Sequence, residues 1–185
     1  MLDFGCATGR VIRHFAAYHP EAKVMGCDIN ALHVHWCNYF LPSNTVVFQN
    51  TSLPYLPLED SSFDIVTAFS VFSHIEAFET SWIAEIARIL KPGGVAYLTI
   101  HSERTFKNLH PQWPIYRVAK HKDFKPEWMG ADMPCDKIIF RDSLERSYAS
   151  NIFLREDYVR RVWGRFMTVE AINEYGYQDA VVLRK

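Results

Sequence analysis

The chain has 185 residues, of which 49% are apolar and 22% are charged, and its formal net charge is −1. This composition suits one soluble domain with a real core, and the near-neutral charge argues against a nucleic acid or an anionic membrane as partner. The four cysteines form no Cys-x-x-Cys pair, and no histidine stands beside them at zinc-finger spacing, so we expect reduced thiols in the cytoplasm and no metal. No apolar run in the sequence reaches membrane-spanning length, which predicts no membrane insertion.

The stretch from Leu2 to Arg10, LDFGCATGR, predicts a strand, a tight turn and the start of a helix. Gly5 and Gly9 lack a side chain and Ala7 has only a methyl, so a ligand can lie against the backbone at the helix N-terminus. The dinucleotide fingerprint has glycines at the first, third and sixth positions of such a turn, which here are Gly5, Ala7 and Arg10. Arg10 therefore argues against a nicotinamide cofactor. An ordinary strand-to-helix turn of another α/β protein remains the alternative.

The pattern acid-x-Gly-x-small-x-Gly is carried by Asp3, Gly5, Ala7 and Gly9. It resembles the first motif of the class I S-adenosylmethionine-dependent methyltransferases, in particular their type 11 and type 25 domains. The resemblance implies S-adenosylmethionine as cofactor, with the loop, Cys6 included, against its methionine part. It also implies that Asp3 helps to organise the amino group of that methionine.

A second buried strand is predicted from Ala22 to Cys27, and it ends at Asp28, about 20 residues beyond the loop. A doubly wound fold presents an acid at this point to a ribose, and one carboxylate can accept both ribose hydroxyl protons. Ile29 is then placed to lie against an adenine face, with Asn30 beside it. The alternative role of Asp28 is to cap the helix that begins near residue 31.

The third predicted strand, Thr45 to Gln49, is followed by Asn50, Thr51 and Ser52. In the methyltransferases that the chain resembles, residues at this point meet the adenine, and one polar side chain binds its exocyclic amine. Many members have an acid there. Which of the three residues makes the contact therefore stays open.

The stretch from Leu56 to Val66 closely resembles the segment that the family places before its fourth strand. That strand is predicted to end near Phe69, so we expect Phe69 and Ser70 to contact the cofactor at the rim where open α/β sheets bind ligands. A helix over 84–90, a Lys-Pro-Gly-Gly turn at 91–94 and a strand over 95–100 form a second family signature.

Two histidines are candidate general bases. His74 follows the fourth strand and His101 ends the fifth, so both are expected on the rim that faces the transferred methyl. A base is needed only if the attacking oxygen or nitrogen must lose its proton. The alternative for each histidine is a structural hydrogen-bonding role.

Residues 102–150 lose periodicity and contain four prolines, which predicts a substrate-covering lid that is too short for a core of its own. This lid is expected to expose five aromatic side chains: Trp113, Tyr116, Phe124, Trp128 and Phe140. Beyond it, the patterns predict a helix over 154–163 and two strands, 166–172 and 178–183, about a Tyr175-Gly176 turn.

Together these elements predict an α/β fold: a doubly wound, Rossmann-like, seven-stranded sheet, mostly parallel with an antiparallel C-terminal strand. We expect one methyltransferase domain over 1–185, with an N-terminal truncation because the first strand begins at once after Met1. Such a domain would occur in the cytoplasm; its oligomeric state stays open.

The resemblance implies an enzyme that moves a methyl group from S-adenosylmethionine to a small-molecule or glycan-like acceptor by in-line displacement, with oxygen preferred over nitrogen. A nucleic-acid acceptor is not expected, because the run Phe69 to Phe72 replaces the Asn/Asp-Pro-Pro-aromatic motif of enzymes that modify flipped bases. The alternatives are a binding module for S-adenosylmethionine or S-adenosylhomocysteine without catalysis, and a nicotinamide-dependent reductase.

Overall fold

The computed structural model describes residues 1–142 and 149–185, in which strands and helices alternate through the first half of the chain. The strands are β1 (Leu2–Phe4), β2 (Val24–Asp28), β3 (Thr45–Gln49), β4 (Phe63–Ala68), β5 (Leu90–Ser102), β6 (Lys137–Arg141), β7 (Ser150–Leu154), β8 (Thr168–Tyr175) and β9 (Gln178–Arg184). The helices are α1 (Ile12–Tyr18), α2 (Ala31–Phe40), α3 (Glu79–Ile89), α4 (Glu103–Lys107) and α5 (Glu156–Val162), with short 3₁₀ turns η1 (Pro114–Lys120), η2 (Pro126–Trp128) and η3 (Trp163–Arg165).

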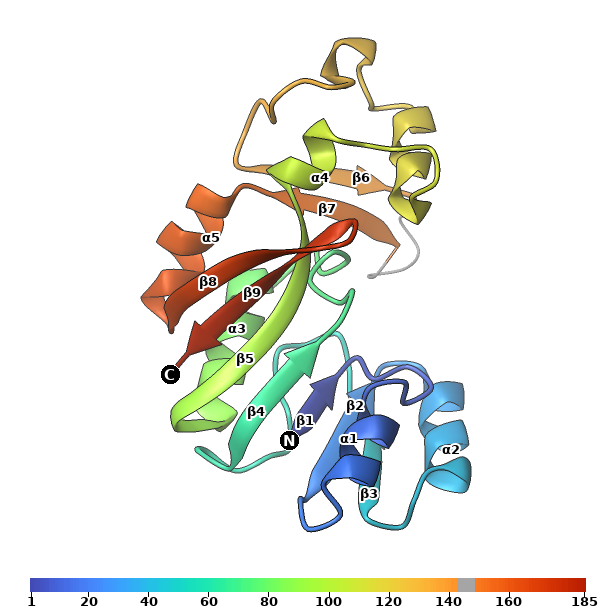
Figure 1. Ribbon diagram of the computed structural model, residues 1–185, viewed down its shortest axis with the longest axis vertical. Helices are drawn as coiled ribbons and strands as arrows, with labels where there is room; N and C mark the ends of the chain where they lie inside the picture. Colours follow the sequence, from blue (N-terminus) through green and yellow to red (C-terminus); the bar gives the residue numbers. More distant parts are fainter. Residues whose placement is uncertain (143–148) are drawn as a thin grey trace.

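In the described part of the chain, seven strands form the main sheet in the order β3-β2-β1-β4-β5-β9-β8 (Figure 1). The first five of these are parallel to one another, β9 is antiparallel to β5, and β8 is antiparallel to β9. The predicted mostly parallel, seven-stranded sheet with an antiparallel C-terminal strand is therefore confirmed.

A second hairpin, β6 with β7, was not predicted. β7 runs parallel to the last two residues of β5, where His101 pairs with Phe153, and β6 is antiparallel to β7. All five residues of β7 are buried, so the segment lacks the alternation that marks a half-exposed strand. The predicted helix over 154–163 is consequently wrong at its start, because Leu154 ends β7 and α5 begins at Glu156.

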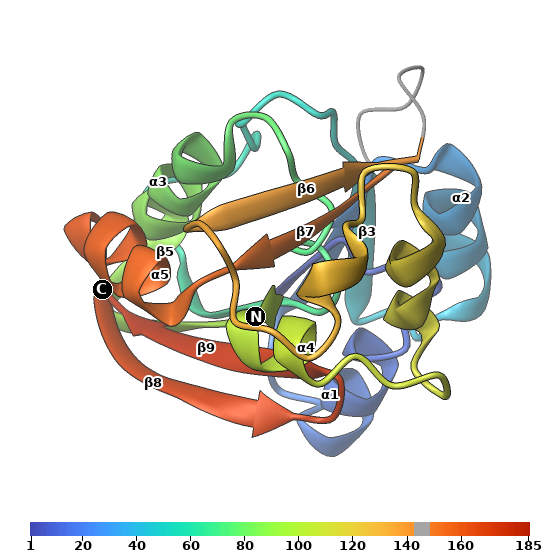
Figure 2. The ribbon, with the colours of Figure 1, turned by 90° about the horizontal axis from the view of Figure 1, so that it is seen from above.

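Helices cover the main sheet on both faces (Figure 2). On one face α1 and α2 contribute Ile12, Ala16 and Cys37 to a cluster with Val24 and Val47 of the sheet. The opposite face packs against α3 and α5 in the largest apolar cluster of the described residues. Covering on both faces explains why the central strands read as nearly continuous apolar runs.

The expectation that residues 102–150 lack a core of their own is wrong. Phe140 is 1% exposed and packs with Phe106 and Phe153, while the other four aromatic residues expected to be exposed are partly buried against this cluster or near it. The aromatic side chains come from short turns and from β6, so no helical or strand period reveals them. The part of the expected lid over 143–148 lies outside the described residues.

The carboxyl ends of the parallel strands β1 to β4 point toward the same edge of the sheet (Figure 1). This is the edge at which open α/β sheets bind ligands. Within 1–142 and 149–185, no helix has the length and apolar character to cross a membrane.

Candidate functional site

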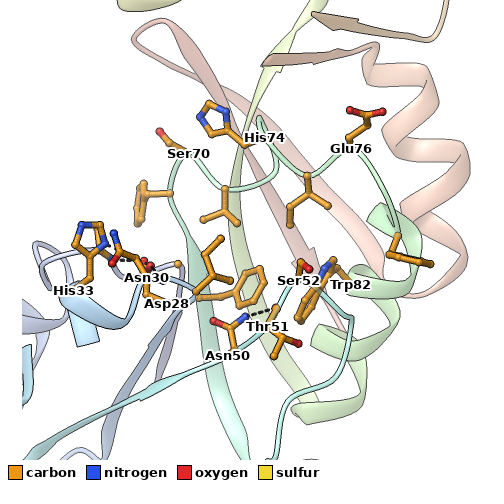
Figure 3. Close-up of a pocket in the computed structure, with 18 of the residues that line it drawn as sticks. Asp28, Asn30, His33, Asn50, Thr51, Ser52, Ser70, His74, Glu76 and Trp82 are labelled. Atoms are coloured by element: carbon orange, nitrogen blue, oxygen red, sulfur yellow. Dashed lines mark hydrogen bonds and ion pairs between the residues drawn. The ribbon is translucent and has the colours of Figure 1, made fainter. Parts of the chain in front are cut away.

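A cavity of about 530 Å³ lies at this edge of the sheet. Its walls come from the loops that follow four separate strands, β1, β2, β3 and β4, together with the start of α3. Figure 3 shows Asp28, Asn30 and His33 on one side of it, Asn50 to Ser52 below, and Ser70 and His74 above. Most of the predicted cofactor residues line it: Gly5, Ala7, Asp28, Ile29, Asn30, Asn50, Thr51, Ser52, Phe69 and Ser70.

The glycine at position 5 is required by its surroundings. Its φ is +73°, a conformation that side chains rarely adopt, and a Cβ added there would stand 2.4 Å from Cγ2 of Val71. Gly9, with a φ of +74°, faces Leu41 and Cys37, so it shapes the loop but lies outside the cavity lining. The loop thus brings its backbone to the cavity wall at Gly5 and Ala7.

Several amides of this loop already have acceptors within the protein. The N–H groups of Gly5 and Cys6 both donate to the carbonyl of Cys27, at 2.8 and 3.0 Å, and Gly9 donates to the carbonyl of Cys6. The amide of Ala7 donates to the carboxylate of Asp28 at 2.8 Å. A phosphate cradle needs free amides, so these engaged groups argue against a dinucleotide and suit a cofactor without phosphates.

Asp28 joins the loop to the second strand. Its Oδ2 accepts from Ala7 and its Oδ1 accepts from the amide of Asn30, each at 2.8 Å. A carboxylate has about four lone-pair sites, of which these amides use two, and Nδ1 of His33 also lies 3.4 Å from Oδ1. The alternative role of Asp28 as helix cap is wrong, because Asn30 caps α2 by accepting from the amide of Leu32.

Asn50 has an acceptor without a partner. Its Nδ2 donates to the carbonyl of Thr51 at 3.0 Å, which fixes the orientation of the amide. Its buried Oδ1 has no hydrogen-bond partner among the described residues. Of the three candidates after β3, Asn50 therefore offers the clearest acceptor for an amine donor.

Ser70 follows β4 in a left-handed conformation, with a φ of +57°. Its amide donates to Oγ1 of Thr99 at 2.7 Å, and its hydroxyl donates to Oε1 of Gln178 at 3.0 Å. Phe69 packs on the ring of Tyr97, with 5.4 Å between centroids. These contacts hold the rim after β4 against β5 and β9.

The structure separates the two histidine candidates. His74 lines the cavity, and its Nδ1 lies 2.7 Å from the carbonyl oxygen of Ser150. Because a carbonyl only accepts, Nδ1 carries the proton and Nε2 keeps its lone pair. Burial lowers the pKa of His74 below its usual range, so the ring is neutral at pH 7.

His101 lies outside the cavity lining and is only 3% exposed. Burial, together with a smaller effect of the nearby His74, lowers its pKa to about 3. Its Nε2 lies 3.3 Å from Nε2 of Gln178 in the core between β5 and β9. This placement favours the structural role that the sequence left open for it.

Two further predicted cofactor residues lie beneath the cavity. Asp3 is 2% exposed and accepts from the hydroxyl of Thr67 at 2.8 Å, while burial raises its pKa to about 7. The thiol of Cys6 is buried next to Ala7, and burial raises its pKa. Asp3 therefore joins β1 to β4, while Cys6 packs within the loop, and neither residue lines the cavity.

Sequence reasoning missed several lining residues, among them His33, Glu76, Phe78 and Trp82. Glu76 accepts two hydrogen bonds from Arg141 of β6, one of them from Nε at 2.8 Å. Phe78 precedes α3 with a φ of +60° and is 54% exposed. No sequence motif marks these positions. Each lies at the cavity only because the chain folds back toward it after β2 or β4.

Comparisons with known proteins agree with this geometry. The profile of a methyltransferase domain family matches residues 2–98, about half of the chain. The chain is 30% identical over 99 residues to the sterol 24-C-methyltransferase erg6 of Schizosaccharomyces pombe, and 26% identical over 119 residues to the demethylmenaquinone methyltransferase of Chlamydia pneumoniae. These matches cover 51% and 64% of this chain, and 26% and 50% of the two relatives.

Solved structures share the whole fold. A methyltransferase structure from Mesorhizobium loti superposes with a TM-score of 0.72 at 15% identity, over 100% of this chain and 89% of its own. One from Methanosarcina mazei reaches a TM-score of 0.70 at 20% identity, over 100% and 91%. With its glycine loop, its acid after β2 and its antiparallel last strand, the chain belongs to the class I S-adenosylmethionine-dependent methyltransferases.

Proposed function

We propose that the protein transfers a methyl group from S-adenosylmethionine to a hydroxyl of a small-molecule or sugar-like acceptor, with His74 as general base. The observation that carries this proposal is the hydrogen bond from Nδ1 of His74 to the carbonyl of Ser150. It holds the neutral ring at the cavity wall with a basic Nε2, the form that can accept a proton from an attacking hydroxyl.

The residues of the cavity fit the cofactor. The backbone of Gly5 lies at the cavity wall without a side chain, Asp28 has lone-pair sites beyond those that its two amide donors use, and Asn50 has an unpartnered oxygen for the adenine amine. Ile29 also lines the cavity and supplies an apolar surface for the adenine. Each feature matches a different part of the same molecule.

When bound, S-adenosylmethionine supplies a methyl group on a positively charged sulfonium, so no covalent participation by the protein is needed. The protein's contribution is to align the acceptor and to hold a proton acceptor near it. Alignment alone can lower the barrier by about 7 to 11 kcal/mol in favourable cases. His74 then removes the hydroxyl proton as the oxygen attacks.

The wall around His74 supports an acceptor with an apolar body. Val71, Ile75 and Phe78 line this part of the cavity, and Glu76 is neutralised by Arg141. The relatives' names include a sterol, demethylmenaquinone, malonyl-[acyl-carrier protein] and a tRNA as acceptors. These names select no acceptor class, so the small-molecule acceptor rests on the apolar lining and on the lack of a basic surface in the composition.

The cofactor site is tested by calorimetric titration of S-adenosylmethionine and S-adenosylhomocysteine into the chain. We expect a dissociation constant in the micromolar range, as is common for enzyme ligands, and its loss in Asp28→Ala. The matched control is Asp123→Ala, an exposed acid far from the cavity lining, which should bind like the unchanged chain. No binding by the unchanged chain would contradict the proposal.

The base is tested by the release of S-adenosylhomocysteine with a panel of hydroxylated acceptors. His74→Gln should slow turnover by about 10² to 10⁴ while cofactor binding persists, and the exposed His35→Gln is the control. Because the pKa of His74 lies below its usual range, the rate should rise with pH only below about pH 6.5 and stay level above it. Binding without turnover of any acceptor would favour the non-catalytic binding module instead.

A further inference from the structure

Gln178, the first residue of β9, connects four side chains near the cavity. It is 5% exposed, and its Oε1 accepts from the hydroxyls of Ser70 at 3.0 Å and Thr99 at 2.9 Å. Its Nε2 lies 3.3 Å from Nε2 of His101 and 3.5 Å from the hydroxyl of Ser73. Gln178 does not itself line the cavity in the described part of the chain.

Two of these partners belong to one short turn after β4. Ser70 has a φ of +57°, in the left-handed region where the backbone of an L residue is strained. Such a conformation persists only where surrounding contacts determine it. For Ser70 those contacts are two hydrogen bonds. Its backbone N–H donates to Oγ1 of Thr99, and its hydroxyl donates to Oε1 of Gln178.

The turn between Ser70 and Ser73 forms part of the cavity wall. Val71 lies within it and approaches Gly5 so closely that no Cβ could stand there. The amide of His74 donates to the carbonyl of Val71 at 2.9 Å, so the position of the base depends on the same turn. Gln178 therefore holds both ends of a segment that contacts the glycine loop and carries His74.

We propose that Gln178 is a positioning residue of the cofactor site, acting through Ser70 and Ser73. It lies 108 positions from Ser70 in the sequence, and it joins the C-terminal hairpin to the rim after β4. The hairpin β8–β9 thus determines the shape of the cavity as well as completing the sheet. This inference rests on the proposed cofactor site, but it does not depend on the identity of the acceptor.

The decisive variant is Gln178→Met, which keeps the length of the side chain and removes its hydrogen bonds. We expect the dissociation constant for S-adenosylmethionine to rise about tenfold to a hundredfold, because buried hydroxyls lose a partner and Ser70 loses a restraint. Thr99→Val is a second variant that releases the amide of Ser70 and should act in the same direction. Thr99→Val is the variant to test if Gln178→Met does not fold.

The control for a merely structural role is Ser102→Ala. Ser102 donates to Asp179, the neighbour of Gln178, so its loss loosens the same hairpin without touching the turn after β4. This variant should lower the free energy of unfolding yet bind the cofactor like the unchanged chain.

The outcomes separate the two proposals. If the unchanged chain binds the cofactor and Gln178→Met binds equally well, the positioning role is overturned while the cofactor site stands. The role is also overturned if Ser102→Ala weakens binding as much as Gln178→Met does. If Gln178→Met weakens binding but no acceptor is ever methylated, the positioning role stands and the proposed catalysis fails. An unchanged chain that binds no S-adenosylmethionine overturns both.

Discussion

Ala7 occupies the middle small position of the loop after β1 with a φ of +47°. An L residue in this region is strained, and glycine is not. Ala7→Gly should therefore raise the free energy of unfolding by about 0.5 to 1 kcal/mol, after allowing for the greater freedom of glycine in the unfolded chain.

Denaturant titration measures this effect. The matched control is Ala16→Gly, a buried position in α1, where the same change should lower the free energy of unfolding by about 1 kcal/mol or more. A loss of stability in Ala7→Gly would show that the loop does not store this strain.

Asp3 makes stability depend on pH, because burial raises its pKa to about 7. Between its unfolded pKa near 4 and about 7, the folded chain keeps a proton that the unfolded chain releases, so this group's contribution to stability falls as pH rises. Asp3→Asn removes that titration. The free energy of unfolding of Asp3→Asn, minus that of the unchanged chain, should therefore be about 2 to 3 kcal/mol larger at pH 7 than at pH 5.

Chemical unfolding of both chains across this pH range measures the difference directly. Other titrating groups are common to the two chains and cancel in the comparison. A difference that stays constant from pH 5 to pH 7 would contradict the raised pKa of Asp3.

The insertion between β5 and β7 is held by its own aromatic cluster. Phe140 of β6 contacts the rings of Phe124, Trp128 and Phe153 within 6.4 Å between centroids. Phe140→Ala should cost about 3 to 5 kcal/mol, the range for a fully buried ring. Hydrogen exchange should become faster in η1, η2 and β6 before it does in β1 and β4.

Phe40→Ala is the control, since Phe40 is 61% exposed at the end of α2 and should change stability by less than about 1 kcal/mol. Equal effects of the two substitutions would mean that the cluster is not a core. A polar contact joins this region to α3: Lys137 of β6 donates to the buried carboxylate of Glu79 at 2.5 Å, and Trp163 of η3 donates to the same carboxylate at 2.6 Å.

For the whole molecule, the cavity depends on four chain segments that only the folded sheet brings together. A ligand that binds this assembled site alone stabilises the fold by about 2.7 kcal/mol at a hundred times its dissociation constant. Thermal unfolding with S-adenosylmethionine should show this shift, and Asp28→Ala should abolish it. Exchange protection should rise together in the loops after β1, β2, β3 and β4; a shift that survives in Asp28→Ala would place the ligand elsewhere.

Much of this architecture could be predicted from local patterns. The strand, loop and helix at the start of the chain, Asp28 at the end of β2 and the C-terminal hairpin follow from spacing and residue type over short stretches. The hairpin β6–β7 and the core of the insertion could not be predicted. Every residue of β7 is buried, and β6 and the 3₁₀ turns are short, so no alternation or helical period extends far enough to mark them.

By itself, the sequence determined the glycine loop and the order of the elements from β1 to β5, because these depend on contacts between near neighbours and on backbone conformations that few residues allow. The resemblance of its motifs also indicated the family. Only the tertiary structure placed His74 at the cavity and His101 in the core, and Asp3 beneath the loop. It also brought Gln178 to Ser70. Such contacts arise from strand register and from packing between segments that are distant in the sequence, and they cannot be predicted from residue types alone.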